Sequence, residues 1–186
     1  MPRALRIGGI VVAAATLTLV ALCALTDMKP YVVPSASMSP GIRQGERIIS
    51  IGGAIERGDV VTVRPNGDGT DVFATTETIS SRTFVKRLIG EPGEVVGARA
   101  GRVFVCRPGV ADAADGTAAG CRFLHERYAL GSTLPFTTRV PRDRYLLLGD
   151  NREGSEDSRS WGTVLRSQIE RRVVFRYWPP WRIGIP

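Results

Sequence analysis

An uncharged apolar run near the N-terminus constrains this chain more than any other feature. Residues Ile7–Leu25 read IGGIVVAAATLTLVALCAL, which is 19 residues without a charge. A helix rises about 1.5 Å per residue, so this run nearly crosses a hydrocarbon core about 30 Å thick. Arg3 and Arg6 precede the run and Asp27 follows it. The positive-inside rule therefore predicts a single-pass anchor of the cell membrane, with a cytoplasmic N-terminus and the rest of the chain outside.

A cleaved secretory signal is the alternative interpretation of the same run, because such signals also have a basic start and an apolar middle. No clear A-x-A site precedes the first polar residues, and the run is longer than a typical signal core. Cys23 is not preceded by the small residue that a lipoprotein site needs. We favour an uncleaved anchor over residues 1–27, and either interpretation places the remaining chain outside the cytoplasm.

The remaining residues, 28–186, number 186 − 27 = 159 and suit one extracytoplasmic domain. The chain has 21 Gly and 12 Pro, which fits many short strands better than a helical bundle. Its net charge of +7 is the difference between 25 basic and 18 acidic residues, and only Lys29 and Lys86 among the basic residues are lysine. The arginines are scattered, so we expect no nucleic-acid partner and attribute the charge to nearby anionic lipids. We expect a monomer.

Strand-like segments cover much of the external domain. Apolar stretches with turn signals between them predict strands at Gly58–Arg64, Thr83–Ile89 and Arg144–Asn151, and a last strand at 171–178. Val95–Val105 predicts a hairpin that turns at Ala100-Gly101, and 65–82 predicts a long hairpin connection. The pattern weakens between about 106 and 139, which indicates a cap-like insertion on a mostly β domain.

Two cysteines, Cys106 and Cys121, belong to the external domain. An oxidising compartment would allow them to pair, closing a loop of about 15 residues worth about 3 kcal/mol in the chain-entropy model. Two free thiols are the alternative. The spacing of these cysteines matches no zinc motif, and we expect neither a metal nor a cofactor.

The lysine at position 86 is the residue whose chemistry stands out. A serine nucleophile needs a base, and the sole histidine, His125, lies in the weakly patterned insertion. A lysine can be that base if burial lowers its pKa from about 10.4 toward neutrality, whereas arginine stays protonated. Phe84, Val85 and Leu88 flank Lys86 on an expected strand. A lysine here, in a chain that otherwise uses arginine, favours a chemical role.

Three segments, taken in order, resemble type I signal peptidases, the membrane-anchored Ser–Lys proteases that release signal peptides. The segments are PSASMSP (34–40), FVKRLIGEPGE (84–94) and GDNREGSEDSRSWG (149–162), and RGDVVTVRP (57–65), the anchor and the closing strand match as well. The resemblance covers nearly the whole chain. It implies antiparallel β-sheets with a small cap, and cleavage of exported preproteins.

The same resemblance assigns roles to individual residues. Ser37 would be the nucleophile and Lys86 the general base. The Ser35 hydroxyl and the Ser37 backbone N–H would form the oxyanion hole, and the Ser155 hydroxyl would orient the base. Asp157 and Arg159 would belong to a supporting polar network.

Shallow apolar pockets for small substrate side chains are a further implication, and they would explain Ala-X-Ala cleavage sites. Val33, Ile42 and Val85 fall at the pocket positions. The chain departs from the family pattern at Gly41, where a threonine or similar residue usually follows the proline, and at Glu153-Gly154, where Asp-Asn often precedes the serine. We expect the loss of that asparagine to loosen the loop around Ser155.

Other functions remain open at this point. A conjugation- or pilus-type maturation peptidase of the same superfamily would use the same residues on fewer substrates. A non-catalytic membrane scaffold would be expected to lack the serine or the lysine, and both are present. A self-cleaving repressor would carry a DNA-binding domain in place of the anchor. The sequence Trp178-Pro179-Pro180-Trp181 suggests contact with the membrane interface or ordinary packing of the last strand.

Overall fold

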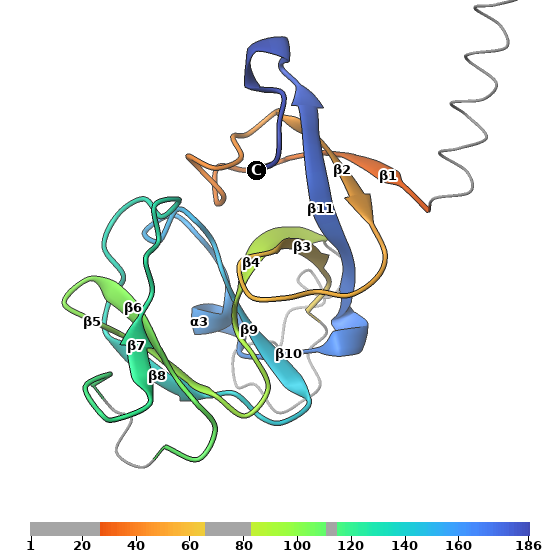
Figure 1. The fold of residues 1–186 in the computed structure, drawn as a ribbon. Helices are drawn as coiled ribbons and strands as arrows, with labels where there is room; N and C mark the ends of the chain where they lie inside the picture. The colour runs from red at the N-terminus through yellow and green to blue at the C-terminus, as the bar shows by residue number, and fades with distance from the viewer. Residues whose placement is uncertain (1–26, 66–82, 111–114) are drawn as a thin grey trace, which may run out of the picture.

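Two antiparallel β-sheets form the protein (Figure 1). The computed structural model describes residues 27–65, 83–110 and 115–186. The larger sheet has seven strands in the order β1-β2-β11-β3-β4-β9-β10, and the smaller has four in the order β7-β6-β5-β8. This arrangement confirms the predicted mostly β, antiparallel fold.

The bounds of the elements agree with most of the predicted strands. The larger sheet contains β1 (Lys29–Val32), β2 (Arg47–Ile51), β3 (Val60–Val63), β4 (Phe84–Gly90), β9 (Arg144–Leu148), β10 (Val164–Leu165) and β11 (Ile169–Trp178). The smaller sheet contains β5 (Val95–Arg99), β6 (Arg102–Cys106), β7 (Cys121–Phe123) and β8 (Phe136–Arg139). The short helices are α3 (Ser158–Trp161) and the 3-10 turns η1 (Arg166–Gln168) and η2 (Pro180–Arg182).

Strand β4 lies inside the larger sheet, paired with β3 on one side and β9 on the other. Every residue of β4 after Phe84 is buried. Side chains alternate along a strand, so Phe84, Lys86 and Leu88 share one face. Phe84 and Leu88 pack in an apolar cluster with Val61, Val63, Leu147, Trp161, Val164 and Ile169. A lysine has therefore been placed among apolar side chains in the middle of a sheet.

The smaller sheet differs from the expected cap. The predicted hairpin forms as β5 and β6, with positive φ angles of 49° at Ala100 and 77° at Gly101. Residues from the weakly patterned insertion add β7 beside β6 and β8 beside β5. These two strands have three and four residues and are only half-buried on alternate positions. They carry too little apolar pattern to be predicted from sequence.

A disulfide joins Cys106 to Cys121 and links β6 to β7. The two cysteines are register partners in the antiparallel pair, so the bond fastens the edge strand β7 to its neighbour β6. The free-thiol alternative does not apply to this structure.

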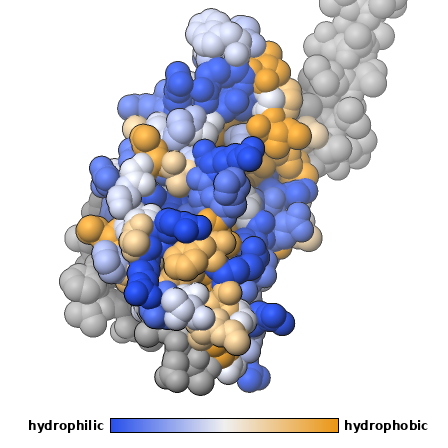
Figure 2. All heavy atoms as spheres, turned by 60° about the vertical axis from the view of Figure 1, so that its left-hand side comes forward, coloured by the Kyte–Doolittle hydropathy of each residue, from blue (hydrophilic) through white to orange (hydrophobic). Residues whose placement is uncertain are grey.

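The predicted anchor, Ile7–Leu25, and most of the predicted connection at 65–82 lie outside the described residues. Within the part that is described, no helix is both long enough and apolar enough to span a membrane. On the face shown in Figure 2, apolar side chains form separate patches among hydrophilic ones.

Candidate active site

Ser37 and Lys86 meet although they are 49 positions apart in the chain. Ser37 lies in the loop between β1 and β2, and Lys86 lies in the middle of β4. The Lys86 Nζ donates a hydrogen bond to the Ser37 Oγ at 2.8 Å. Lys86 is only 2% exposed and Ser37 is 9% exposed. The two residues that the sequence paired are thus in direct contact and nearly free of solvent.

Burial lowers the pKa of Lys86 from its ordinary value to about 8. Removal of water from around the ammonium group is the largest cause, since it disfavours the charged form. The carboxylates of Asp157 and Glu156 oppose this by favouring the charge, and Arg159 adds to the lowering. A substantial fraction of the amine is therefore neutral at mildly alkaline pH, and a neutral amine can accept a proton.

A cleft of about 580 Å³ opens above this pair. Its lining residues come from the loop that carries Ser37, from the start of β4 and from the loop after β9: Val33, Pro34, Ser35, Ser37, Thr83, Phe84, Val85, Lys86, Gly154 and Glu156. The Ser35 Oγ donates a hydrogen bond to the Ser37 Oγ at 3.2 Å. The Ser35 hydroxyl thus lies beside the predicted nucleophile and faces the cleft. An oxyanion hole would need a second hydrogen-bond donor at this place, in addition to the Ser37 N–H.

The three predicted pocket residues do not all reach the cleft. Val33 and Val85 line it. Ile42 does not line it, because its side chain is completely buried in the cluster that also holds Val33, Met38, Ile48 and Val85. The prediction for Ile42 is therefore corrected: it supports the two lining valines from inside the core.

Ser155 also lies differently from the prediction. Its Oγ is buried and has no hydrogen-bond partner among the described residues. The residue lines a neighbouring cleft that Leu134, Phe136, Arg152 and Arg159 share. The loop around it places Gly154 and Glu156 at the cleft of Lys86, and the Ser155 side chain packs against Gly149. In this geometry Ser155 does not orient the lysine by a hydrogen bond.

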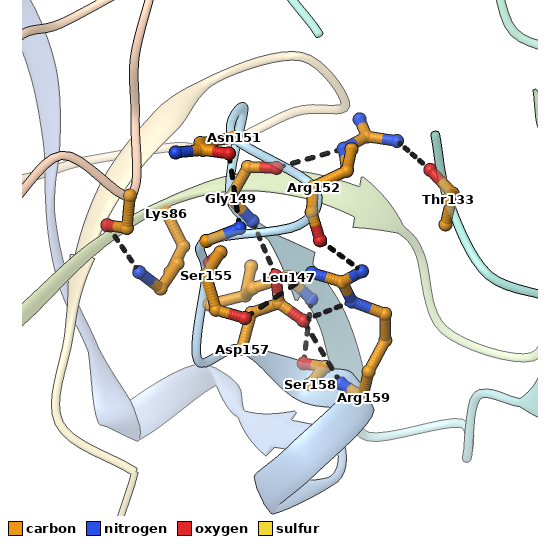
Figure 3. A network of polar contacts seen from close by, with 12 residues as sticks. Lys86, Thr133, Leu147, Gly149, Asn151, Arg152, Ser155, Asp157, Ser158 and Arg159 are labelled. Carbon is orange, nitrogen blue, oxygen red and sulfur yellow. Dashed lines mark hydrogen bonds and ion pairs between the residues drawn. The ribbon is translucent and has the colours of Figure 1, made fainter. Parts of the chain in front are cut away.

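Asp157 and Arg159 form the expected polar network behind the site (Figure 3). The Asp157 carboxylate is completely buried and accepts two hydrogen bonds of 2.7 Å from the Arg159 guanidinium. It also accepts a hydrogen bond from the Gly149 N–H at 2.9 Å, and Arg159 donates to the Arg152 carbonyl at 2.7 Å. The network fixes the backbone of the loop from Gly149 to Arg159, which runs beside Lys86 and Ser37.

Hydrogen bonds of Asn151 and Glu153 hold the loop from Gly149 to Ser155, where the sequence departs from the family pattern. Asn151 Oδ1 accepts a hydrogen bond from the Gly154 N–H at 3.1 Å, and Glu153 accepts one from the Ser132 N–H at 3.1 Å. Asn151 thus stabilises the turn from within the loop, and Glu153 ties the loop to the residues before β8.

Sequence reasoning missed two contacts that hold the nucleophile. The Asn151 N–H donates to the Ser37 carbonyl at 3.0 Å, which connects the loop after β9 to the residue expected to react. Arg87, next to Lys86, forms a buried bidentate ion pair with Asp150 at 2.8 and 2.7 Å. Arg87 and Asp150 lie within two of the motifs singled out in the sequence, which was a possible signal. A single sequence, however, does not indicate that these two residues form a pair.

The departure at Gly41 has a steric explanation. A Cβ atom at Gly41 would lie 2.6 Å from the Asp150 Oδ2, closer than real Cβ contacts allow. Asp150 cannot move freely because both its carboxylate oxygens are bonded to Arg87. Here, therefore, the ion pair occupies the space that a larger residue after Pro40 would need.

His125 is exposed and accepts a hydrogen bond from Arg127 at 2.8 Å. It contributes nothing to the cleft. Among the residues described, no group of three or more His, Cys, Asp or Glu side chains could hold a metal ion. A buried lysine hydrogen-bonded to a serine at the floor of a cleft has the residue composition that the class of Ser–Lys hydrolases uses.

Comparison with known proteins agrees with that class. The family model described as signal peptidase, peptidase S26, matches residues 6–178. The chain is 32% identical over 159 residues to the probable signal peptidase I-2 of Synechocystis, covering 82% of this chain and 64% of that protein. It is 31% identical over 165 residues to signal peptidase IB of Staphylococcus aureus, covering 81% of this chain and 78% of that protein. The chain belongs to the signal peptidase family, peptidase S26.

A signal peptidase I from Enterococcus faecalis is a solved structure similar to this one. Its crystal structure aligns with a TM-score of 0.46 at 25% identity, covering 64% of this chain and 97% of that chain. A further relative, signal peptidase I of Leptolyngbya laminosa, is 32% identical over 160 residues, covering 82% of this chain and 70% of that protein.

Proposed function

We propose that this chain is a membrane-anchored serine endopeptidase that cleaves N-terminal signal peptides from exported preproteins. The observation that supports this proposal most strongly is the 2.8 Å hydrogen bond between the Ser37 hydroxyl and an amine, that of Lys86, which is nearly inaccessible to water. Membership of the signal peptidase family and relatives named signal peptidase I support the same activity.

The proposed mechanism begins with Lys86 in its neutral form. As the Ser37 Oγ attacks the scissile carbonyl carbon, the hydroxyl proton moves to the Lys86 Nζ. The Ser35 hydroxyl and the Ser37 backbone N–H donate to the developing oxyanion, and each such donor is typically worth about 10²–10³ in rate. The Lys86 ammonium then gives its proton to the leaving amine as the peptide bond breaks. Water then attacks the acyl carbon and Lys86 takes one proton from it. As the bond from the acyl carbon to the Ser37 Oγ breaks, Lys86 returns this proton to the Oγ, which regenerates the Ser37 hydroxyl and the neutral amine and releases the carboxylic acid.

The cleft walls beside Ser37 support the proposed substrate class. Val33 and Val85 present short β-branched side chains to the space in front of the nucleophile. Walls of this kind favour small side chains on the substrate, so we propose cleavage after Ala-X-Ala sequences. Ile42 packs with the two valines in one buried cluster and supports their positions.

The test of this function is cleavage of a panel of preproteins by the full chain in detergent or lipid. We expect cuts after Ala-X-Ala in many unrelated preproteins, located by mass spectrometry, and no cleavage by Ser37→Ala. Cleavage of only one or two pilin-type or conjugation-type precursors would instead identify a maturation peptidase. A folded wild type that cleaves none of the panel would favour a membrane scaffold.

The placement of the site relative to the membrane is a further part of the proposal. Residues 1–27 would form the anchor, with the N-terminus in the cytoplasm, and residues 28–186 the extracytoplasmic domain. The C-terminal segment exposes large apolar side chains, with Trp181 81%, Ile183 55% and Ile185 84% accessible. Tryptophan favours the membrane interface and basic domains are attracted to anionic lipids. We propose that this end of the domain touches the bilayer.

Replacing Trp181 with serine is therefore expected to weaken vesicle binding by a chain that begins at Met28 and lacks the anchor. Loss of one interfacial aromatic side chain should lower the fraction that sediments with vesicles containing anionic lipid, without changing the melting temperature. The matched control is Leu134→Ser, just before β8, where the side chain is similarly exposed at 77%. Equal vesicle binding by wild type and Trp181→Ser would contradict the proposed contact between the C-terminal segment and the membrane.

A further inference from the structure

The C-terminal segment contacts the loop that carries Ser37. After β11 the chain turns through η2 and comes back, so that Arg176 and Gly184 exchange backbone hydrogen bonds of 2.8 and 3.0 Å. Figure 1 shows the C-terminus ending beside the loop between β1 and β2. Two arginines of this segment, Arg176 and Arg182, point at that loop and bond its main chain.

The groups that these arginines hold are the carbonyls of Pro40 and Gly41, shortly after Ser37. The Arg182 Nη2 donates to both carbonyls at 3.0 Å, and the Arg176 Nη1 donates to the Gly41 carbonyl at 2.5 Å. The turn between them and Ser37 is closed by hydrogen bonds from Ser39 N to the Ala36 carbonyl and from Ile42 N to the Met38 carbonyl. A shift of Pro40 or Gly41 would therefore move the whole turn.

A buried carboxylate keeps the two arginines in place. Glu46 is 3% exposed and lies 2.5 Å from the Arg182 Nε and 3.4 Å from the Arg176 Nη1. It also accepts a hydrogen bond from the Arg43 N–H at 3.0 Å. A carboxylate buried to this extent needs cationic partners, and the Arg182 Nε supplies the opposite charge through an ion pair without a hydrogen bond, while the Arg182 Nη2 is used on the carbonyls. One planar side chain, that of Arg182, thus bridges Glu46 and the nucleophile loop.

The opposite side of the same turn is also fixed. The Asp150 carboxylate lies so close to Gly41 that no Cβ fits there, and Asn151 holds the Ser37 carbonyl. The turn is therefore held between the loop after β9 on one side and the C-terminal arginines on the other. On the C-terminal side, Arg176 belongs to β11, and Arg182 belongs to η2, which follows that strand.

We propose that Arg182 is a positioning residue for the nucleophile, acting through the Pro40 and Gly41 carbonyls to keep the Ser37 hydroxyl within reach of Lys86. This inference rests on the proposed function. Arg182 does not line the substrate cleft, so its loss should alter the reaction step more than substrate binding. Misplacement of a reacting group by about 1 Å can cost about 10²-fold in rate.

The test compares Arg182→Ala and Arg182→Lys with wild type in the full chain. Kinetics of preprotein cleavage, acylation of Ser37 by a small activated ester, and the melting temperature are measured for each protein. We expect kcat to fall about 10- to 100-fold in Arg182→Ala, with KM within about twofold and acylation slowed by the same factor. Arg182→Lys keeps the charge beside Glu46 but lacks the planar fork, so stability should recover more than kcat.

Arg99→Ala is the matched control, because Arg99 is also ion-paired but lies in the smaller sheet, with its side chain 56% exposed. It should leave kcat unchanged. The inference is overturned if both Arg182 variants keep kcat within twofold of wild type, or if their losses vanish at temperatures well below their melting points. If the wild type is acylated at Ser37 but cleaves no preprotein, the proposed function is contradicted. The positioning role of Arg182 can still be measured in that case from the rate of acylation.

Discussion

Replacing Lys86 with arginine is expected to abolish preprotein cleavage, although charge and approximate length are kept. The guanidinium stays protonated and cannot take the proton of Ser37. A general base typically contributes about 10²–10⁴ in rate, so kcat/KM should fall by at least that factor. The measurement is the rate of preprotein cleavage at a pH above the Lys86 pKa of about 8, where the wild-type amine is mostly neutral.

The chain offers a matched control for this change. Lys29, the other lysine, is exposed on β1, so Lys29→Arg makes the same substitution away from the site. It should cleave at the wild-type rate. Circular dichroism would show whether Lys86→Arg is still folded, because burying a permanent charge costs stability. Substantial remaining cleavage by a folded Lys86→Arg would rule out Lys86 as the base.

Replacing Gly149 with alanine is expected to be nearly as damaging. A Cβ atom there would lie 2.4 Å from the Ser155 Cβ and 2.6 Å from the Ser37 carbonyl oxygen. The Gly149 N–H is also bonded to the buried Asp157 carboxylate, so the glycine cannot easily move away. The new methyl group should push the two loops apart and displace Ser37 from Lys86. We expect kcat/KM to fall about 10²-fold or more, measured in the same cleavage assay.

Gly52→Ala is the control for this second change. The Cβ at Gly52 would meet only the end of the exposed Asp27 side chain, at 3.2 Å. Activity close to that of wild type is expected there. If Gly149→Ala cleaved as fast as Gly52→Ala, the close packing of the two loops would have no role in placing the nucleophile.

Much of the larger sheet could be predicted from sequence because its strands are short apolar runs between turn residues. The segment around Lys86 is the clearest case, since its apolar neighbours indicated burial and the structure places it inside the sheet. The hairpin at Ala100-Gly101 was also predictable, because its turn requires positive φ angles that glycine adopts readily. The local pattern of apolar and turn residues was sufficient to predict a strand wherever the burial of that one segment determined its structure.

The features that could not be predicted depend on contacts between distant segments. Strands β7 and β8 form only because the hairpin β5–β6 offers two open edges. Ile42 and Val33 looked equally suited to a pocket wall, but packing sends one into the core and the other to the cleft. The contacts of Arg182 with Pro40 and Gly41 join residues more than 140 positions apart, and no local pattern reports them.

The most direct test of the Ser37–Lys86 mechanism is the rate of Ser37 acylation as a function of pH. The full chain is treated with an activated ester of an Ala-X-Ala peptide, and mass spectrometry locates the adduct. Because only neutral Lys86 can accept the Ser37 proton, the rate should rise with pH through an apparent pKa near 8. The adduct should lie on Ser37 and be absent from Ser37→Ala. An adduct on another residue, or a rate that does not change with pH across that range, would contradict the mechanism.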